Sequence, residues 1–120
     1  MTIWRKYYEN LASIREKGCL MPYCPEECEH NAHMFFIRCP SLELRTKFIS
    51  YMKSNDISCV FHYIPLHSSP AGKKYGRISG TMECTDIVSN TLVRLPLFYG
   101  LRDEDVDFII EKILSFWKEV

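Results

Sequence analysis

The sequence has no surplus of charge of either sign. Its 15 lysines and arginines balance its 15 aspartates and glutamates, so the formal net charge is zero over 120 residues. Proteins that bind nucleic acids or anionic membrane surfaces usually carry a basic surplus. We therefore expect neither a nucleic acid nor a membrane surface as a partner.

Long apolar runs are also missing. No stretch approaches the roughly 18 apolar residues that a membrane-spanning helix needs. Residues 1–8 lack the apolar centre of a secretion signal, which predicts a cytoplasmic protein. There is no internal repeat and no low-complexity tract. The hydrophobic share of 47% and the charged share of 25% are ordinary for a globular protein, and the length suits a single domain over residues 1–120.

Cysteine, in contrast, is abundant, and without a secretion signal we expect reduced thiols rather than disulfides. Cys24, Cys28, His30 and His33 have the side chains of metal ligands, but they crowd into one short segment with Pro25 between the cysteines. Zinc sites usually separate two ligand pairs along the chain. This crowding favours packing and loop roles, so we expect no metal site. The six cysteines are Cys19, Cys24, Cys28, Cys39, Cys59 and Cys84.

Apolar residues at spacings of three and four predict amphipathic helices. The first covers residues 3–16, with Gly18 as its C-terminal cap. The second begins at the N-cap Ser41 and runs to about residue 54, and a short third helix begins at Thr85 and runs to about residue 92. The last helix runs from about residue 103 to residue 117, with three acidic residues in its first turn.

Three segments rich in β-branched and aromatic residues predict strands over residues 32–39, 57–63 and 93–97. Because Pro96 interrupts the third strand, we expect that strand at an edge of the sheet. The elements together predict an α+β fold, a small and mostly antiparallel three-stranded sheet with helices packed on one face. Residues 64–81 are expected to form a long loop, and loops of that length are usually functional or disordered.

Four segments carry a resemblance to a known family. They are Asn31-Ala-His-Met-Phe-Phe-Ile37, the stretch from Arg45 to Ile57, Phe61-His-Tyr-Ile-Pro-Leu-His67, and Arg94-Leu-Pro-Leu-Phe98. In these segments the chain resembles the C-terminal small domain of the DegT/DnrJ/EryC1/StrS family, the sugar aminotransferases of fold type I. The resemblance runs over essentially the whole chain.

The resemblance implies a function that this chain carries only in part. Full-length members use pyridoxal phosphate, which is held by a large domain through a Schiff-base lysine, an aspartate and phosphate-binding residues. We expect that large domain to be absent from these 120 residues, so the chain has no catalytic and no cofactor-binding residue and is inactive alone. The segments His30-Asn-Ala-His-Met34 and His62 to Gly72 resemble most the branch that transfers an amino group from glutamate to dTDP-4-keto-6-deoxyglucose, in enterobacterial common antigen and lipopolysaccharide biosynthesis.

The resemblance also implies a substrate site. In related enzymes the segment of His62, Tyr63 and His67 lines the nucleotide-sugar side of the cleft. Imidazole and phenol groups can hydrogen-bond sugar hydroxyls or a diphosphate, so we predict these three residues as substrate-binding residues for a dTDP-linked sugar. The basic residues of the following loop, Lys73, Lys74 and Arg77, could add charge near the diphosphate.

Two other functions remain open at this point. The chain could be a stand-alone nucleotide-sugar-binding module, or half of a split enzyme whose large domain is encoded separately. It could also be a small zinc protein that uses its cysteines and histidines. The first helix would normally pack on the missing domain, so its face of Trp4, Tyr7 and Tyr8 is predicted to be exposed and to favour self-association.

Overall fold

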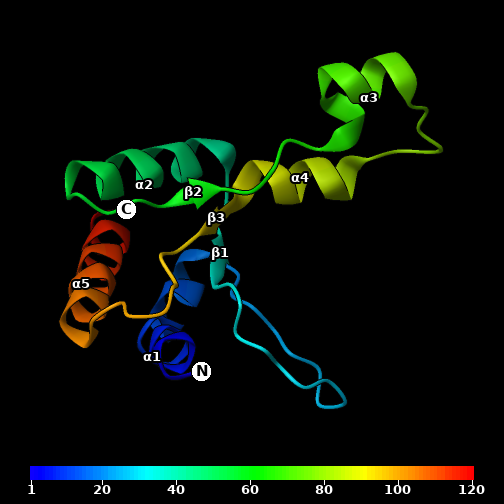
Figure 1. Ribbon diagram of the computed structural model, residues 1–120. Coiled ribbons are helices and arrows are strands. Elements are labelled where there is room, and N and C mark those ends of the chain that lie inside the picture. Colours follow the sequence, from blue (N-terminus) through cyan, green and yellow to red (C-terminus); the bar gives the residue numbers. More distant parts are fainter.

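The computed structural model describes all residues from 1 to 120, and its N-terminal helix, sheet and C-terminal helix lie close together (Figure 1). None of its helices combines the length and the apolar character needed to cross a membrane. The elements in chain order are α1 (Thr2–Asn10), the 3₁₀ helix η1 (Ala12–Lys17), β1 (Phe36–Arg38), α2 (Leu42–Ser54), β2 (Val60–Phe61), the 3₁₀ helix η2 (Leu66–Ser68), α3 (Pro70–Tyr75), α4 (Glu83–Thr91), β3 (Leu92–Arg94) and α5 (Asp103–Glu119).

The three strands form one antiparallel sheet in the order β1-β3-β2. The predicted α+β class with a small antiparallel sheet is confirmed, although each strand is shorter than predicted. The predicted edge position of the third strand is wrong, because β3 lies at the centre. Arg94 is paired with Phe36 on one side and with Val60 on the other. Pro96 lies beyond the paired residues, so its missing N–H costs the ladder no hydrogen bond.

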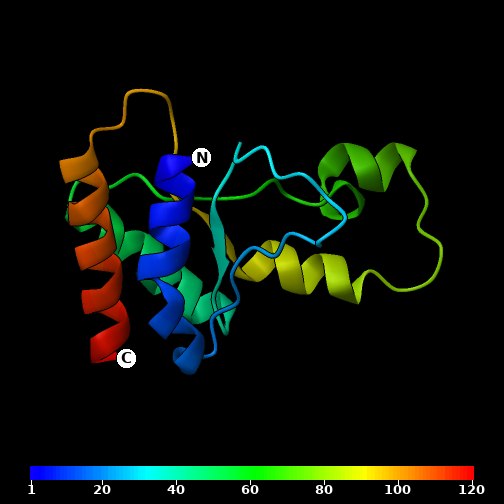
Figure 2. The same cartoon turned by 90° about the horizontal axis from the view of Figure 1, so that it is seen from below.

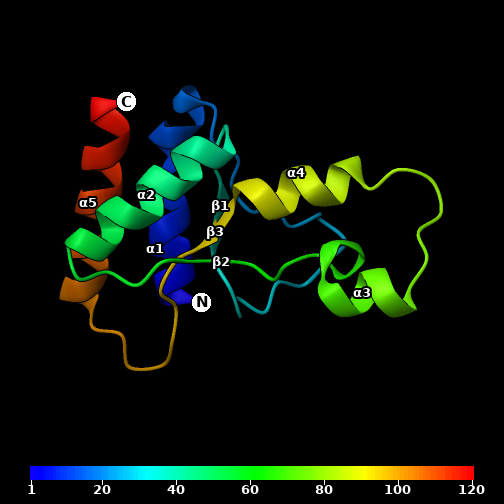
Figure 3. The ribbon, with the colours of Figure 1, turned by 90° about the horizontal axis from the view of Figure 1, so that it is seen from above.

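One face of the sheet is covered by α1, α2 and α5, as predicted (Figure 3). Ile37 and Val93 lie opposite each other on this face and are completely buried. Phe48 of α2 and Trp117 of α5 stack with their ring centroids 6.0 Å apart, and both are buried. The apolar stripes of these helices and the inner face of the sheet therefore form a single core.

The N-terminal helix differs from its prediction. Its α-helical part ends at Asn10, and residues 12–17 continue as η1. Leu11 and Ile14 are three residues apart, so a helix with three residues per turn keeps both on the core side, and both are buried. Gly18, with a φ of 80°, ends η1 in the left-handed conformation, which confirms its predicted role as a cap.

The predicted exposure of the first helix is wrong. Trp4 and Tyr7 are both buried, while Tyr8 is only partly covered. The indole Nε1 of Trp4 donates to the carbonyl of Met34 over 3.1 Å, and the hydroxyl of Tyr7 donates to the carbonyl of Pro96 over 2.9 Å. Trp4 and Tyr7 therefore pack against the sheet and loops of this same chain. The exposed aromatic patch that was predicted for α1 is not formed.

The helix caps agree with the sequence in one case and not in another. Ser41 precedes α2 with extended backbone, and its side chain accepts a hydrogen bond from the backbone N–H of Leu44 over 3.1 Å, as predicted. Thr85 was predicted as the N-cap of the third helix, but α4 begins at Glu83 and no side chain caps it. Thr85 instead lies within the first turn of α4.

Candidate functional site

Residues 62–91 form a projecting arm, which contains η2, α3 and α4 and extends away from the helices of the core (Figure 2). The predicted loop over residues 64–81 is wrong in part, because η2 and α3 lie within it. Ser69 caps α3, since its Oγ accepts from the N–H of Gly72 over 2.9 Å, and Pro70 occupies the first turn. Serine followed by proline is a common beginning of a helix, and this signal was present in the sequence.

A first open cavity of about 540 Å³ lies at the base of the arm, between the segment that follows β2 and the helix α4. Predicted site residues His62 and Tyr63 line it on one side, and Thr85, Val88 and Ser89 line it on the other. The hydroxyl of Ser89 donates to the carbonyl of Tyr63 over 3.3 Å and so joins the two walls.

His62 has hydrogen-bonding capacity that the chain leaves unused. Its ring lies edge-on to Tyr63, with the centroids 4.9 Å apart. Its Nδ1 is buried and has no hydrogen-bond partner. Buried polar atoms in folded proteins nearly always have a partner, so this nitrogen is an exception within the chain. Tyr63 is largely exposed, with 76% of its surface accessible, and its phenol is free to contact a ligand.

A second cavity of about 640 Å³ lies further out, between α3 and the beginning of α4. It adjoins the first cavity, because Leu66 and Thr85 line both. His67 lies here, with Lys73 and Arg77. The structure therefore brings His62 and Tyr63 together and places His67 in the neighbouring cavity.

His67 is held by a carboxylate. Its Nε2 lies 2.9 Å from Oδ1 of Asp86, and only 16% of the His67 side chain is exposed. No sequence motif pointed to Asp86 or Ser89. They lie three residues apart within a helix that was predicted, so they share one face of it. Their common face could be read from the sequence, whereas its position against the histidine-containing segment is visible only in the fold.

Sequence patterns left a zinc site open as an alternative, and the structure gathers no cluster of three or more cysteine, histidine or acidic side chains that could hold a metal ion. The ring of His30 packs edge-on against Trp4, with centroids 4.1 Å apart. The Nδ1 of His33 lies 2.9 Å from Oδ1 of Asn31, and the thiol of Cys24 lies 3.3 Å from the carbonyl of Cys28. These side chains therefore serve local loop contacts.

The structure also bears on where pyridoxal phosphate could be held. A Schiff-base lysine needs a neutral amine, which proteins obtain by burying the lysine or by placing another cation nearby. No lysine of this chain is buried. The hydrogen bonds that Lys6 donates to the carboxylates of Asp103 and Asp107 raise the pKa of Lys6, which is the wrong direction for that role. The lysines present do not fit the cofactor.

Comparisons with a family model, curated sequences and solved structures all match this chain to aminotransferases or to part of a longer protein. The model of the DegT/DnrJ/EryC1/StrS aminotransferase family matches residues 1–114. An uncharacterized protein of Methanocaldococcus jannaschii is 28% identical over 121 residues, which cover 98% of this chain and 30% of that protein. The chain thus spans about a third of the length of this curated relative.

This chain also matches about 30% of the length of several solved structures. A protein of Streptococcus pneumoniae, provisionally described as a sugar aminotransferase and solved in its PMP form, is 27% identical with a TM-score of 0.80. That match covers 98% of this chain and 30% of the other. DesV of S. venezuelae, solved with a ketimine intermediate, is 21% identical with a TM-score of 0.87 over 99% of this chain and 31% of the other. At that identity the likeness to DesV concerns the fold.

Proposed function

Because this chain belongs to the DegT/DnrJ/EryC1/StrS aminotransferase family, we propose that residues 1–120 act as the small domain of a pyridoxal-phosphate-dependent nucleotide-sugar aminotransferase. The domain forms one wall of the substrate cleft. The amino transfer itself is performed by a large domain, either linked to these residues or encoded separately. The match of the whole chain to about 30% of the length of a sugar aminotransferase supports this division.

The observation that carries the proposal is the first cavity. It offers an imidazole with an unpartnered, buried Nδ1 at His62 and an exposed phenol at Tyr63, beside the apolar side chains of Ile64, Pro65 and Val88. A deoxysugar or a pyrimidine presents hydroxyl, carbonyl and N–H groups on a partly apolar frame. Concave sites with mostly apolar walls and a few fixed polar groups are typical of such ligands.

For the substrate we propose dTDP-4-keto-6-deoxyglucose, with glutamate as the amino donor, in the synthesis of enterobacterial common antigen or lipopolysaccharide. This choice rests on the resemblance of residues 62–72 to one branch of the family. We propose the cytoplasm as the location, from the lack of an apolar centre in residues 1–8.

We further propose that the chain does not transaminate alone. Electron-sink chemistry is supplied by the cofactor, and the protein must hold it through a lysine and orient its ring. The eight lysines of this chain lie on its exposed or half-buried surface. The ammonium groups of Lys6 and Lys47 lie 2.7–2.8 Å from carboxylate oxygens, and those of Asp103 and Asp107 raise the pKa of Lys6.

The test is a titration of the ¹⁵N-labelled chain with dTDP-4-keto-6-deoxyglucose, followed by NMR. We expect the largest shifts at His62 and Tyr63 and across the cavity at Ser89. Tyr63→Ala should weaken binding by about five- to tenfold, as loss of a stacked or hydrogen-bonded aromatic contact does. Tyr99→Ala is the matched control, because Tyr99 is an exposed tyrosine as well but lies in the segment before α5 and does not line this cavity. Absence of binding, or equal losses in both variants, would count against the proposed substrate wall.

A further inference from the structure

We propose that Cys19 and Cys39 form a disulfide under oxidising conditions, and that this bond fixes the two ends of the segment of residues 20–38. The oxidant is a small disulfide such as oxidised glutathione. Both thiols are free in the structure, so the pair is a site of reversible modification. The inference rests on the fold of this chain and does not depend on the proposed function.

The two cysteines lie opposite each other in a short antiparallel pairing. Leu20 and Arg38 form an isolated bridge, in which the N–H of each donates to the carbonyl of the other over 3.0 and 2.8 Å. Beside such a hydrogen-bonded pair, antiparallel chains place a pair without mutual hydrogen bonds, whose Cα atoms are about 4.5 Å apart. Because Cys19 precedes Leu20 and Cys39 follows Arg38, the two cysteines occupy that position.

A second contact lies on the other side of the cysteine pair. A Cβ atom built at Gly18 would lie 3.4 Å from Cγ of Pro40. Cys19 and Cys39 therefore lie between two contacts that join the same two segments. Disulfides require Cα atoms roughly 4.4–6.8 Å apart, a range that includes the spacing of such a pair.

Both thiols lie on the core side of the sheet. Cys19 and Cys39 are 1% and 4% exposed and belong to the same hydrophobic core as Ile37, which lies two residues before Cys39 on the same face of β1. Burial raises the pKa of each thiol to about 12, and the neighbouring Cys19 adds to the rise at Cys39, whereas Arg45 opposes it. The two sulfur atoms thus share one water-free environment.

The other cysteines do not share this arrangement. Cys59 directly precedes β2, and β3 separates β2 from β1 in the sheet. Cys24 contacts the carbonyl of Cys28 and lies within the segment of residues 20–38, so a bond between these two would leave both ends of the segment free. Cys84 lies on α4.

Access of the oxidant controls the reaction, because a buried and protonated thiol is inert. Leu20 is 55% exposed, and two hydrogen bonds join it to β1. Cys39 is held more firmly, since its N–H donates to the carbonyl of Thr91 within the sheet over 2.9 Å. Local opening of the bridge at Leu20 therefore exposes Cys19 first.

The exchange then proceeds in two balanced steps. The thiolate of Cys19 attacks one sulfur of oxidised glutathione, forms a mixed disulfide and releases one glutathione thiolate. When the bridge closes again, the thiolate of Cys39 attacks Sγ of Cys19, and the second glutathione leaves. The protein loses two electrons and two protons, and the glutathione disulfide is reduced to two thiols.

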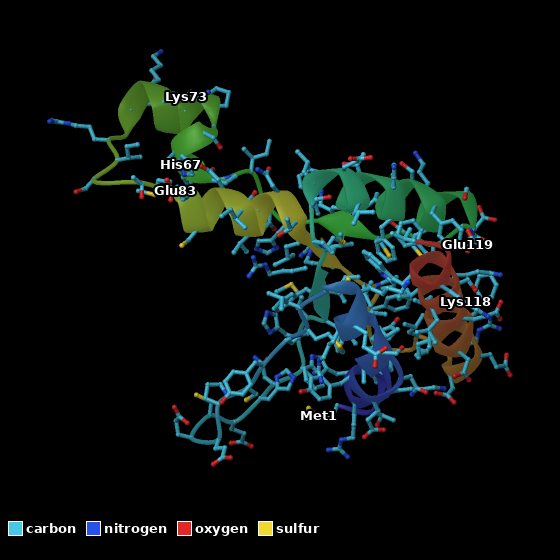
Figure 4. The ribbon with its side chains drawn as sticks, turned by 180° about the vertical axis from the view of Figure 1, so that it is seen from behind. Met1, His67, Lys73, Glu83, Lys118 and Glu119 are labelled. Carbon is cyan, nitrogen blue, oxygen red and sulfur yellow. The ribbon has the colours of Figure 1, made fainter.

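The segment that the bond would fix borders the candidate site. Residues 21–35 contain no helix and no strand. Figure 4 shows this loop extending from the core on the side of Met1, apart from the arm that carries His67. His33 and Met34, near its end, line a cavity of about 390 Å³ together with His62. The redox state of the cysteine pair therefore sets how firmly this wall beside His62 is held.

The experiment incubates the full 120-residue chain with oxidised glutathione, blocks the remaining thiols with N-ethylmaleimide and maps the disulfides by tryptic digestion and mass spectrometry. Trypsin cleaves after lysine and arginine, so Cys19 falls in the peptide of residues 18–38 and Cys39 in the peptide of residues 39–45. We expect these two peptides to be joined, and the joined species to separate on reduction.

Two matched variants assign the bond. Cys24→Ser/Cys28→Ser removes the other thiols of the first peptide and should keep the link. Cys59→Ala removes the third buried thiol and should keep it as well. Cys39→Ala should lose it.

Two further measurements on the Cys24→Ser/Cys28→Ser variant show whether the bond fixes the segment. Closing a loop of about 20 residues should raise Tm by about 10 °C. Exchange of the amide protons of Leu20 and Arg38 should slow by about tenfold or more, because the bond opposes opening of the bridge between them.

The contrary results are equally specific. Joined peptides that disappear in Cys24→Ser/Cys28→Ser, or a bond between Cys24 and Cys28 alone with both core thiols unoxidised, would overturn the assignment. A bond between Cys19 and Cys39 that changes neither Tm nor the exchange of Leu20 would overturn its role in fixing the segment.

Discussion

The Nε2 atom of His67 lies 2.9 Å from Oδ1 of Asp86, and this contact joins η2 to α4 across the arm. Along the chain these two elements are separated by α3 and an exposed stretch. It also commits one nitrogen of His67 to the protein. The two predicted histidines therefore differ in what they can offer a ligand, because His62 retains a buried and unpartnered Nδ1.

The packing of α3 on η2 depends on the missing side chain of Gly72. We expect Gly72→Ala to displace α3, because the added Cβ would overlap the carbonyl of Leu66. NMR shifts should change over residues 66–77 and leave the core unchanged, since no residue of η2 or α3 belongs to the core cluster. The control is Ala71→Gly, which lowers helix propensity in the same helix without a clash. Equal shifts in both variants would show that propensity, and not the close approach, fixes α3.

The cap of α2 is expected to contribute measurably to stability. Ser41→Ala removes the side-chain oxygen that accepts from the N–H of Leu44, so the free energy of unfolding should fall by about 1 kcal/mol. The measurement is urea unfolding at constant pH. Ser50→Ala is the matched control, because Ser50 is exposed within the same helix and alanine there should be neutral or slightly stabilising. If the free energy of unfolding falls no more in Ser41→Ala than in Ser50→Ala, the capping role is contradicted.

The buried hydroxyl of Tyr7 ties α1 to the segment after β3. Tyr7→Phe should lower the free energy of unfolding by about 1 kcal/mol, because the carbonyl of Pro96 loses its donor. Tyr8→Phe removes a hydroxyl that makes no hydrogen bond within the chain and should change stability little. Differential scanning calorimetry of the two variants compares them directly, and a larger loss for Tyr8→Phe would refute the assignment.

Three buried thiols are expected to make the protein sensitive to alkali. Burial raises the pKa values of Cys19, Cys39 and Cys59 from 9.0 to about 12. Above pH 9 the thiols of the unfolded chain ionise while those of the folded chain stay protonated. The unfolded state then binds fewer protons, so the free energy of unfolding falls as the pH rises from about 9 towards 12.

The measurement for the thiols is the slope of unfolding free energy against pH between 8 and 10. Cys59→Ala should reduce that slope by about one third, because it removes one of three equivalent contributions. Cys84→Ala, at an exposed position, should leave the slope unchanged. An unchanged slope in Cys59→Ala would contradict the origin proposed for the alkaline instability.

The sequence predicted the individual helices better than the order of the strands in the sheet. The spacing of apolar residues found α2 and α5, and Ser41 and Gly18 marked real ends, because caps are local signals. The central position of β3 was missed, since strand order depends on contacts between distant segments. Pro96 suggested an edge, but pairing ends at Arg94, two residues earlier. The split of the first helix was also missed, because the same apolar spacing suits an α-helix that continues into a 3₁₀ helix.

The candidate site was predicted in part. The segment of His62 and Tyr63 does line a cavity, whereas His67 lies in an adjoining one. Asp86 and Ser89 were missed, because their relevance depends on how α4 lies against that segment. Trp4 and Tyr7 were expected to be exposed without a second domain to cover them. Instead, the sheet of this chain and the loop that carries Met34 bury both residues. Burial of a helix face cannot be read from periodicity, which shows only that some partner is needed.

The most direct test of the central claim is the absorbance spectrum of the purified chain after incubation with pyridoxal phosphate and exhaustive dialysis. Our account holds that these residues form a substrate-side domain without a lysine that can carry the cofactor. It predicts that the spectrum after dialysis shows protein absorbance alone and does not change on addition of glutamate. A retained cofactor band that glutamate discharges would show that a lysine of this chain performs the chemistry, and it would contradict the account.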